Sequence, residues 1–127
     1  MSALGLVAVG LGAALGAWMR WALALAWNPV LSWLPLGTLA ANVAGGFLVG
    51  VAGEALGRAA EVPAEWRLFL ITGFLGGFTT FSTFSAETVG LLERGMPGAA
   101  LLLVLAHVVG SVLATVAGIA CVRALAA

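Results

Sequence analysis

The chain has 127 residues, of which 63% are hydrophobic and only 8% are charged, with a formal net charge of zero. This composition excludes an ordinary soluble domain, and the missing positive charge argues against a nucleic-acid-binding protein. The single cysteine excludes an internal disulfide. Most charged residues lie within 54–67 and 87–94, which leaves four apolar runs long enough for membrane helices of about 20 residues. We therefore predict an all-α, multi-pass membrane protein in which residues 1–127 form one four-span domain.

The first predicted span covers residues 3–26. Gly12 and Gly16 are spaced so that another helix could approach closely. Arg20 lies between Trp18 and Trp21, residue types that favour the membrane–water interface. Arg20 is therefore either an interface anchor or a fixed positive charge at the mouth of an anion pathway, and both roles are compatible.

The second predicted span covers residues 36–53 and contains one amide side chain, Asn42, followed by a cluster of glycines. A membrane-embedded asparagine is either a hydrogen-bonding link between helices or a group that lines a polar pathway. A polar linker, 54–65, follows, and its Pro63 is suited to starting the next helix.

The third predicted span, residues 66–92, contains an unusual stretch between Gly73 and Ser85. Three glycines fall within 73–77, and five hydroxyl residues then alternate with phenylalanines. Because glycine is a weak helix former, this pattern predicts a helix interruption near 73–80. Irregular backbone at bilayer depth must be buried in protein or line a polar cavity. Freed carbonyl groups there could hold a small cation and hydroxyl groups could donate to an anion, so we predict that this stretch is the centre of an ion pathway.

The side chains after the interruption are candidates for that pathway. Phe81 and Phe84 share a helix face, where they either pack in a core or turn their partly positive ring edges toward an anion. The hydroxyl groups could bond back to their own helix, but five of them exceed that need, and Ser82 and Thr83 are taken as pathway residues. Glu87 is either a boundary carboxylate or a group in a vestibule of the pathway.

The fourth predicted span, residues 99–122, follows a turn at 95–98. His107, Ser111 and Thr115 recur every four residues and so lie on one face of the helix. His107 is either a hydrogen-bonded packing residue or, with the two hydroxyl residues, part of a polar track. No span contains a carboxylate placed to orient His107 beside a nucleophile, so we predict that the protein is not an enzyme.

The arginines predict an unusual topology. Four spans place both termini and the 54–67 linker on one side of the membrane with three arginines, which leaves two for the other side. Because an excess of Lys and Arg sets orientation, such a small difference predicts insertion in both directions. Two copies could then form a closed antiparallel dimer.

The motifs resemble those of a known family. The stretch from Gly73 to Ser85 resembles the signature of the CrcB/Fluc fluoride channels, and residues 12–20 and 37–45 resemble its motifs in the first and second spans. The resemblance extends along the whole chain in the same order.

This resemblance implies an antiparallel, dual-topology homodimer in the cell membrane with two pores that pass fluoride passively and selectively. It also implies a structural Na+ at the dimer centre, held by the backbone carbonyls of Gly76 and Thr79 from each subunit. The other correspondences are pore or vestibule side chains: the ring edges of Phe81 and Phe84, the amide of Asn42, the vestibule groups Arg20 and Glu87, and the hydroxyl track of Ser111 and Thr115. His107 stands where a tyrosine is expected.

Two other classes of membrane protein remain as alternatives. Small proton-coupled multidrug exporters also have four short spans and dual topology, but they need a membrane-embedded carboxylate, typically in the first span. The first span here contains Arg20 and no acidic residue. A structural scaffold subunit would not need the cluster of glycines and hydroxyl residues.

Overall fold

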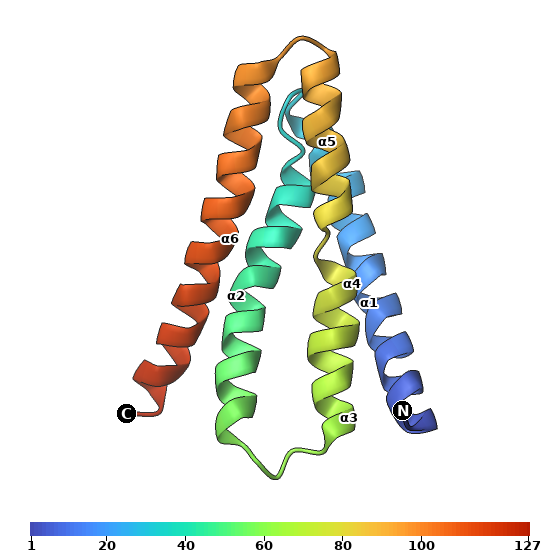
Figure 1. Cartoon of the computed structure of the whole chain (residues 1–127), viewed down its shortest axis with the longest axis vertical. Helices are drawn as coiled ribbons and strands as arrows, with labels where there is room; N and C mark the ends of the chain where they lie inside the picture. Colours follow the sequence, from blue (N-terminus) through green and yellow to red (C-terminus); the bar gives the residue numbers. More distant parts are fainter.

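The computed structural model describes residues 1–127 as an all-helical protein built from four long rods (Figure 1). The rods are α1 (Ala3–Trp27), α2 (Leu36–Arg58), a composite third rod, and α6 (Pro97–Leu125); a short 3₁₀ turn, η1 (Asn28–Val30), follows α1. The third rod consists of α3 (Ala64–Arg67), the π-helical η2 (Leu68–Leu75), α4 (Gly76–Phe78) and α5 (Phe81–Glu93). Each rod is long and apolar enough to cross a membrane. Both termini and the α2–α3 linker lie at the same end (Figure 1).

The ends of the rods follow ordinary capping chemistry. The side chain of Ser2 accepts a hydrogen bond from the Gly5 N–H (3.0 Å) and so caps α1. The turn between α5 and α6 depends on Gly95, whose φ of 71° is disfavoured for residues with a Cβ. The N–H groups of Gly95 and Met96 return to the carbonyls of Leu92 and Leu91, the two bonds of a Schellman motif. Pro97 then starts α6.

The gap in the third rod, at Thr79 and Thr80, lies within the predicted range 73–80, but the glycines that were expected to cause it are helical. Gly73, Gly76 and Gly77 all lie within helical segments. Their small size instead permits a close crossing with α1: a Cβ on Gly77 would collide with the backbone of Ala13, and one on Gly16 with the Phe74 carbonyl. Close approach of small residues replaces hydrophobic burial as the source of helix association in lipid.

Extended backbone is instead confined to the two threonines that follow. Thr79 (φ −85°, ψ 157°) and Thr80 (φ −152°, ψ 116°) separate α4 from α5. Threonine is β-branched and tolerates extended backbone better than glycine does. These two residues redirect the chain near the middle of the third rod (Figure 1).

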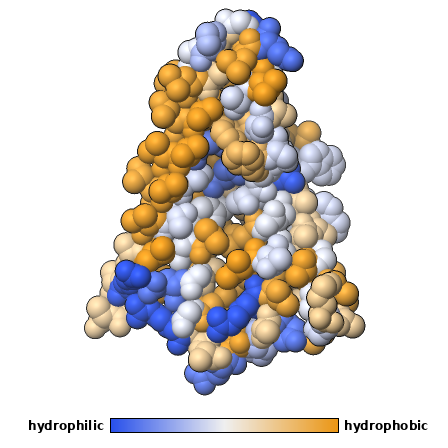
Figure 2. Space-filling view, viewed as in Figure 1, coloured by the Kyte–Doolittle hydropathy of each residue, from blue (hydrophilic) through white to orange (hydrophobic).

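The surface is mainly apolar. Only 18 of 127 residues are buried, so most large hydrophobic side chains of α1 and α6 point outward. Figure 2 shows hydrophobic residues along the edge formed by α6 and hydrophilic residues at both ends of the molecule. The buried core cluster consists of Phe84, Leu91, Ala100 and Leu103, which join α5 to α6. This distribution fits a multi-pass membrane protein, whose outer surface faces hydrocarbon.

Candidate ion-pathway site

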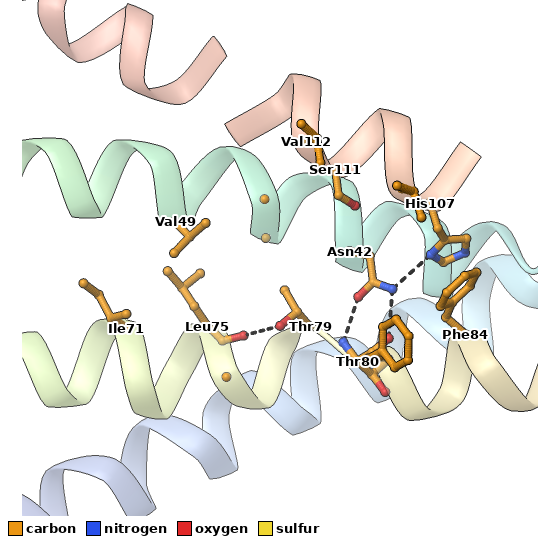
Figure 3. Close-up of a pocket in the computed structure, with 15 residues that line it drawn as sticks. Asn42, Val49, Ile71, Leu75, Thr79, Thr80, Phe84, His107, Ser111 and Val112 are labelled. Atoms are coloured by element: carbon orange, nitrogen blue, oxygen red, sulfur yellow. Dashed lines mark hydrogen bonds between the residues drawn. The ribbon is translucent and has the colours of Figure 1, made fainter. Parts of the chain in front are cut away.

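The two extended threonines face a cleft between the third rod, α2 and α6. Its volume is ≈ 450 Å³, and its lining contains no Asp, Glu, Lys or Arg. Seven of the residues predicted from the sequence line this one cleft: Asn42, Gly76, Thr79, Phe81, Phe84, His107 and Ser111. The fold therefore brings together residues from three separate rods of the chain (Figure 3).

Asn42 replaces the hydrogen bonds that the third rod loses at Thr80. Its Oδ1 accepts from the Thr80 N–H (2.7 Å), and its Nδ2 donates to the Thr80 carbonyl (2.9 Å). The side-chain amide thus satisfies both backbone groups of one extended residue, as Figure 3 shows. In a membrane interior these groups find no water, so the side chain on α2 stabilises the extended segment.

Asn42 also contacts α6. Its Nδ2 lies 3.0 Å from Nδ1 of His107, and the His107 ring stacks on Phe84 with a centroid separation of 4.6 Å. His107 is only 3% exposed. Because an amide nitrogen has two hydrogens, Thr80 and His107 together use both donors of Asn42. An anion could therefore be contacted by Asn42 only if one of these bonds opened.

The two phenylalanines differ in exposure. Phe81 and Phe84 make an edge-to-face contact at 5.4 Å, with an interplanar angle of 72°. Phe84 is 7% exposed and belongs to the core cluster, whereas Phe81 is 77% exposed. The shared face predicted from their spacing is therefore present, but within one chain only Phe84 is covered by protein.

The hydroxyl residues of α6 face α2. The Thr115 Oγ1 lies 2.9 Å from both the Gly46 and the Ser111 carbonyl oxygens, and a Cβ on Gly46 would meet the Ser111 backbone. The side chain of Ser111 points into the cleft (Figure 3). Thr115 does not line the cleft, so its hydroxyl joins the two helices.

The hydroxyl groups after the glycines bond mostly to one another or to their own helix. Thr79 donates to the Leu75 carbonyl (2.8 Å). Thr80 Oγ1 caps α5 by accepting from the Thr83 N–H (3.1 Å), and it donates to the Thr83 hydroxyl (3.0 Å). Ser82 lies 3.3 Å from the same Thr80 oxygen and is exposed. Ser82 and Thr83 therefore lie beside the cleft, not in its lining.

The Gly76 and Thr79 carbonyls are among those that lose their helical donors at the interruption. The Thr80 N–H, which would reach the Gly76 carbonyl in a continuous helix, donates to Asn42. The Thr83 N–H, the corresponding donor for Thr79, donates to the Thr80 hydroxyl. None of the backbone hydrogen bonds in turns, loops and caps ends on either carbonyl. Such oxygens are suitable ligands for an alkali cation, so the donor chemistry of Gly76 and Thr79 fits the expected Na+.

Arg20 and Glu87 lie outside the cleft and apart from each other. The Arg20 Nε donates to the Gly77 carbonyl (3.1 Å), which ties α1 to the end of α4. Glu87 accepts a hydrogen bond from the Thr38 hydroxyl (2.7 Å) and lines a second hollow near the α5–α6 turn. Its Oε2 is buried without a partner.

Thr80 and Thr38 belong to the site but were not predicted individually from the sequence. Thr80 is the residue that Asn42 holds. Thr38 joins Glu87 to Asn28, whose Oδ1 accepts from the Thr38 N–H (3.0 Å). Their role could have been suspected, because the N–H and carbonyl groups of an interrupted helix must find side-chain partners. The sequence alone does not tell which side chain bonds to which backbone group.

Almost the whole chain is similar in sequence to proteins of one known family. Residues 7–119 match the family described as CrcB-like protein, Camphor Resistance (CrcB). A relative from Cupriavidus necator is 55% identical over 126 residues, which cover 99% of this chain and 100% of the relative. One from Ralstonia nicotianae is 53% identical over 125 residues (98% and 99%), and one from Nitrosospira multiformis is 54% identical over 121 residues (95% and 94%). All three are named fluoride-specific ion channel FluC.

Proposed function

Because this chain belongs to the CrcB-like protein family, we propose that it is a passive, selective fluoride channel through which cytoplasmic fluoride leaves across the cell membrane. The observation that carries the proposal is the cleft at residues 79–80, which has no charged side chain and is lined by residues from three rods, a few of them polar. The relatives' shared name supports fluoride as the ion.

The chemistry of the cleft suits a small, strongly hydrated anion. Such an ion passes only if protein groups replace its water and yet do not hold it too tightly. Ser111 supplies a hydroxyl donor and His107 an imidazole, while Phe81 and Phe84 supply aromatic edges with partial positive charge. No permanently charged side chain lines the cleft, so no fixed cation would trap the anion there.

The functional unit in this proposal is an antiparallel dimer. Phe81 and Gly76 both line the cleft and are exposed in the single chain, so a second copy would complete the wall that one chain leaves open. The small difference in arginine number between the two sides supports insertion in both orientations. A two-fold arrangement of such copies is closed and forms two equivalent pathways.

A structural Na+ at the dimer centre is part of the same proposal. The Gly76 and Thr79 carbonyls, freed of their helical donors, would hold it. When bound, the cation would satisfy oxygens that otherwise face hydrocarbon and would add positive potential between the two pathways.

Fluoride efflux from proteoliposomes tests the proposed function. With voltage clamped by potassium and an ionophore and with no pH gradient, we expect rapid fluoride release and chloride release at least about a hundredfold slower, a difference of about 2.7 kcal/mol in barrier. Protein-free vesicles give the background. Release that appears only with an imposed pH gradient would favour a proton-coupled exporter, and no fluoride release at all would refute the channel.

The proposed dimer and its two orientations in the membrane are tested by separate experiments. In sodium-containing buffer we expect two copies per particle, and in sodium-free buffer a smaller dimer fraction, by size-exclusion chromatography with light scattering. Met96→Cys in a Cys121→Ser background provides a single labelling site in the exposed α5–α6 turn and leaves the number of arginines on each side unchanged. A membrane-impermeant thiol reagent should label about half of the copies from each side of sealed vesicles. Labelling from one side alone would contradict dual topology.

A further inference from the structure

Arg20 supplies a hydrogen bond that the third rod loses at its interruption. In a continuous helix the carbonyl of Gly77 would accept from the N–H of Phe81, but the extended residues 79–80 separate these two groups. The Nε of Arg20, one turn beyond Gly16 on α1, donates to that carbonyl instead (3.1 Å). Because α1 and α4 pack side by side (Figure 1), a side chain of α1 completes the end of α4.

No carboxylate neutralises the charge of Arg20. The ion pairs of the chain all involve Glu54, near the C-terminal end of α2. The partly buried guanidinium lies instead at the C-terminal end of the helical segment 64–78, where the unpaired carbonyls of a helix carry partial negative charge. The Gly76 carbonyl lies at the same end and points the same way along the helix axis as that of Gly77. A cation held by Gly76 would therefore lie next to a fixed positive charge.

We propose that Arg20 sets the affinity of the cation site at the Gly76 and Thr79 carbonyls: its charge weakens cation binding there, while its hydrogen bond to Gly77 holds the interruption in shape. This inference rests on the Na+ of the proposed fluoride channel. Like charges repel, and the repulsion is stronger where water is excluded. In the proposed dimer, two such arginines would act on one cation. Arg20 is thus a positioning residue that acts through a neighbouring carbonyl.

Three substitutions separate the charge of Arg20 from its hydrogen bond. The amide nitrogen of glutamine is the same number of bonds from Cα as the Nε of arginine, so Arg20→Gln keeps the donor to Gly77 and removes the charge. Arg20→Lys keeps the charge and a donor. Arg20→Met removes both while keeping a long unbranched side chain. The charge predicts one order of effects among these variants and the hydrogen bond another.

The sodium dependence of dimerisation measures the affinity without any transport assay. Size-exclusion chromatography with light scattering gives the dimer fraction as sodium chloride replaces choline chloride at constant ionic strength, and a cation that binds only the dimer increases that fraction. We expect the sodium concentration at the midpoint to be at least about tenfold lower for Arg20→Gln than for wild type, and unchanged within about twofold for Arg20→Lys. A variant that only damaged the dimer would need more sodium, so a purely structural role would not move the midpoint in this direction.

Arg94→Gln is the matched control. It removes one arginine from the exposed α5–α6 turn and changes the arginine number on the predicted side of Arg20 by the same amount, so its midpoint should equal that of wild type. Arg20→Met should also have a lower midpoint and replaces Arg20→Gln if that variant does not assemble. At saturating sodium, Arg20→Met should unfold at a lower temperature than Arg20→Gln, because the Gly77 carbonyl loses its donor.

Equal or higher midpoints in both uncharged variants would overturn the inference, as would a lower midpoint in Arg94→Gln. A wild-type dimer fraction that does not depend on sodium would refute the proposed Na+ and this inference with it. Fluoride efflux from the same preparations decides the channel separately, because wild-type protein that releases no fluoride would refute the channel whatever the midpoints are.

Discussion

Asn42→Leu is expected to abolish fluoride efflux and to destabilise the protein. Leucine has a similar size but leaves both the N–H and the carbonyl of Thr80 without partners. Each unsatisfied buried backbone group costs about 1–3 kcal/mol. We therefore expect a loss of several kcal/mol, measured as a lower unfolding temperature in detergent, together with efflux at the level of protein-free vesicles.

Asn28→Leu is a matched control for this prediction. Asn28 also uses its Oδ1 to accept from a threonine N–H, that of Thr38, and its Nδ2 lies 3.3 Å from the Thr38 hydroxyl. This site lies outside the cleft. The control should lose stability but retain fluoride efflux. If both variants conducted equally well, Asn42 would be a structural link between helices and no more.

Phe81→Ile and Phe84→Ile are each expected to reduce fluoride efflux at least about tenfold, which corresponds to about 1.4 kcal/mol in barrier, while the dimer persists. Isoleucine keeps much of the apolar volume but removes the aromatic edge that faces the anion in our proposal. Loss of the edge-to-face contact should cost about 0.5–1.5 kcal/mol in stability. The efflux assay and light scattering of the same preparations measure the two effects separately.

Phe69→Ile removes a comparable aromatic contact elsewhere. Phe69 and Trp66 also meet edge to face, at 6.0 Å and 75°, and neither lines the cleft. This variant should conduct like wild type. Wild-type efflux in both Phe81→Ile and Phe84→Ile would eliminate the ring edges as ion contacts.

The spans were predictable because hydropathy is a local property. The expected ranges 3–26, 36–53, 66–92 and 99–122 fall within the observed rods, which differ mainly by extending a few residues further. The longest extension, at the end of α2, occurs where charged residues remain helical: Glu54 pairs with Arg58 (2.9 Å) and with Arg123 of α6 (3.2 Å). Apolar length alone underestimates a helix that continues beyond the hydrocarbon region.

The gap in the third rod lies within the predicted range 73–80, but it was wrongly attributed to the glycines of 73–77. Low helix propensity suggested that they break the third rod, but propensity is a weak preference that packing overrides. Gly73 and Gly77 face Gly12 and Ala13 of α1, and the close crossing keeps them helical. The similar pairs of small residues in α1 and the third rod were visible in the sequence; their mutual contact was not.

The sequence by itself determined four membrane-spanning helices, their order, the positions of the polar residues along them and membership of the family, because composition, spacing and motif are properties of neighbouring residues. The tertiary structure alone decided how those polar groups are used. Asn42 lies 38 residues from Thr80 and 65 from His107, yet hydrogen-bonds to both, while Thr115 is held between two carbonyls and Ser111 faces the cleft. A hydrogen bond depends on distance and direction in space, and only the packing of the rods brings donors and acceptors from distant parts of the chain within reach of one another.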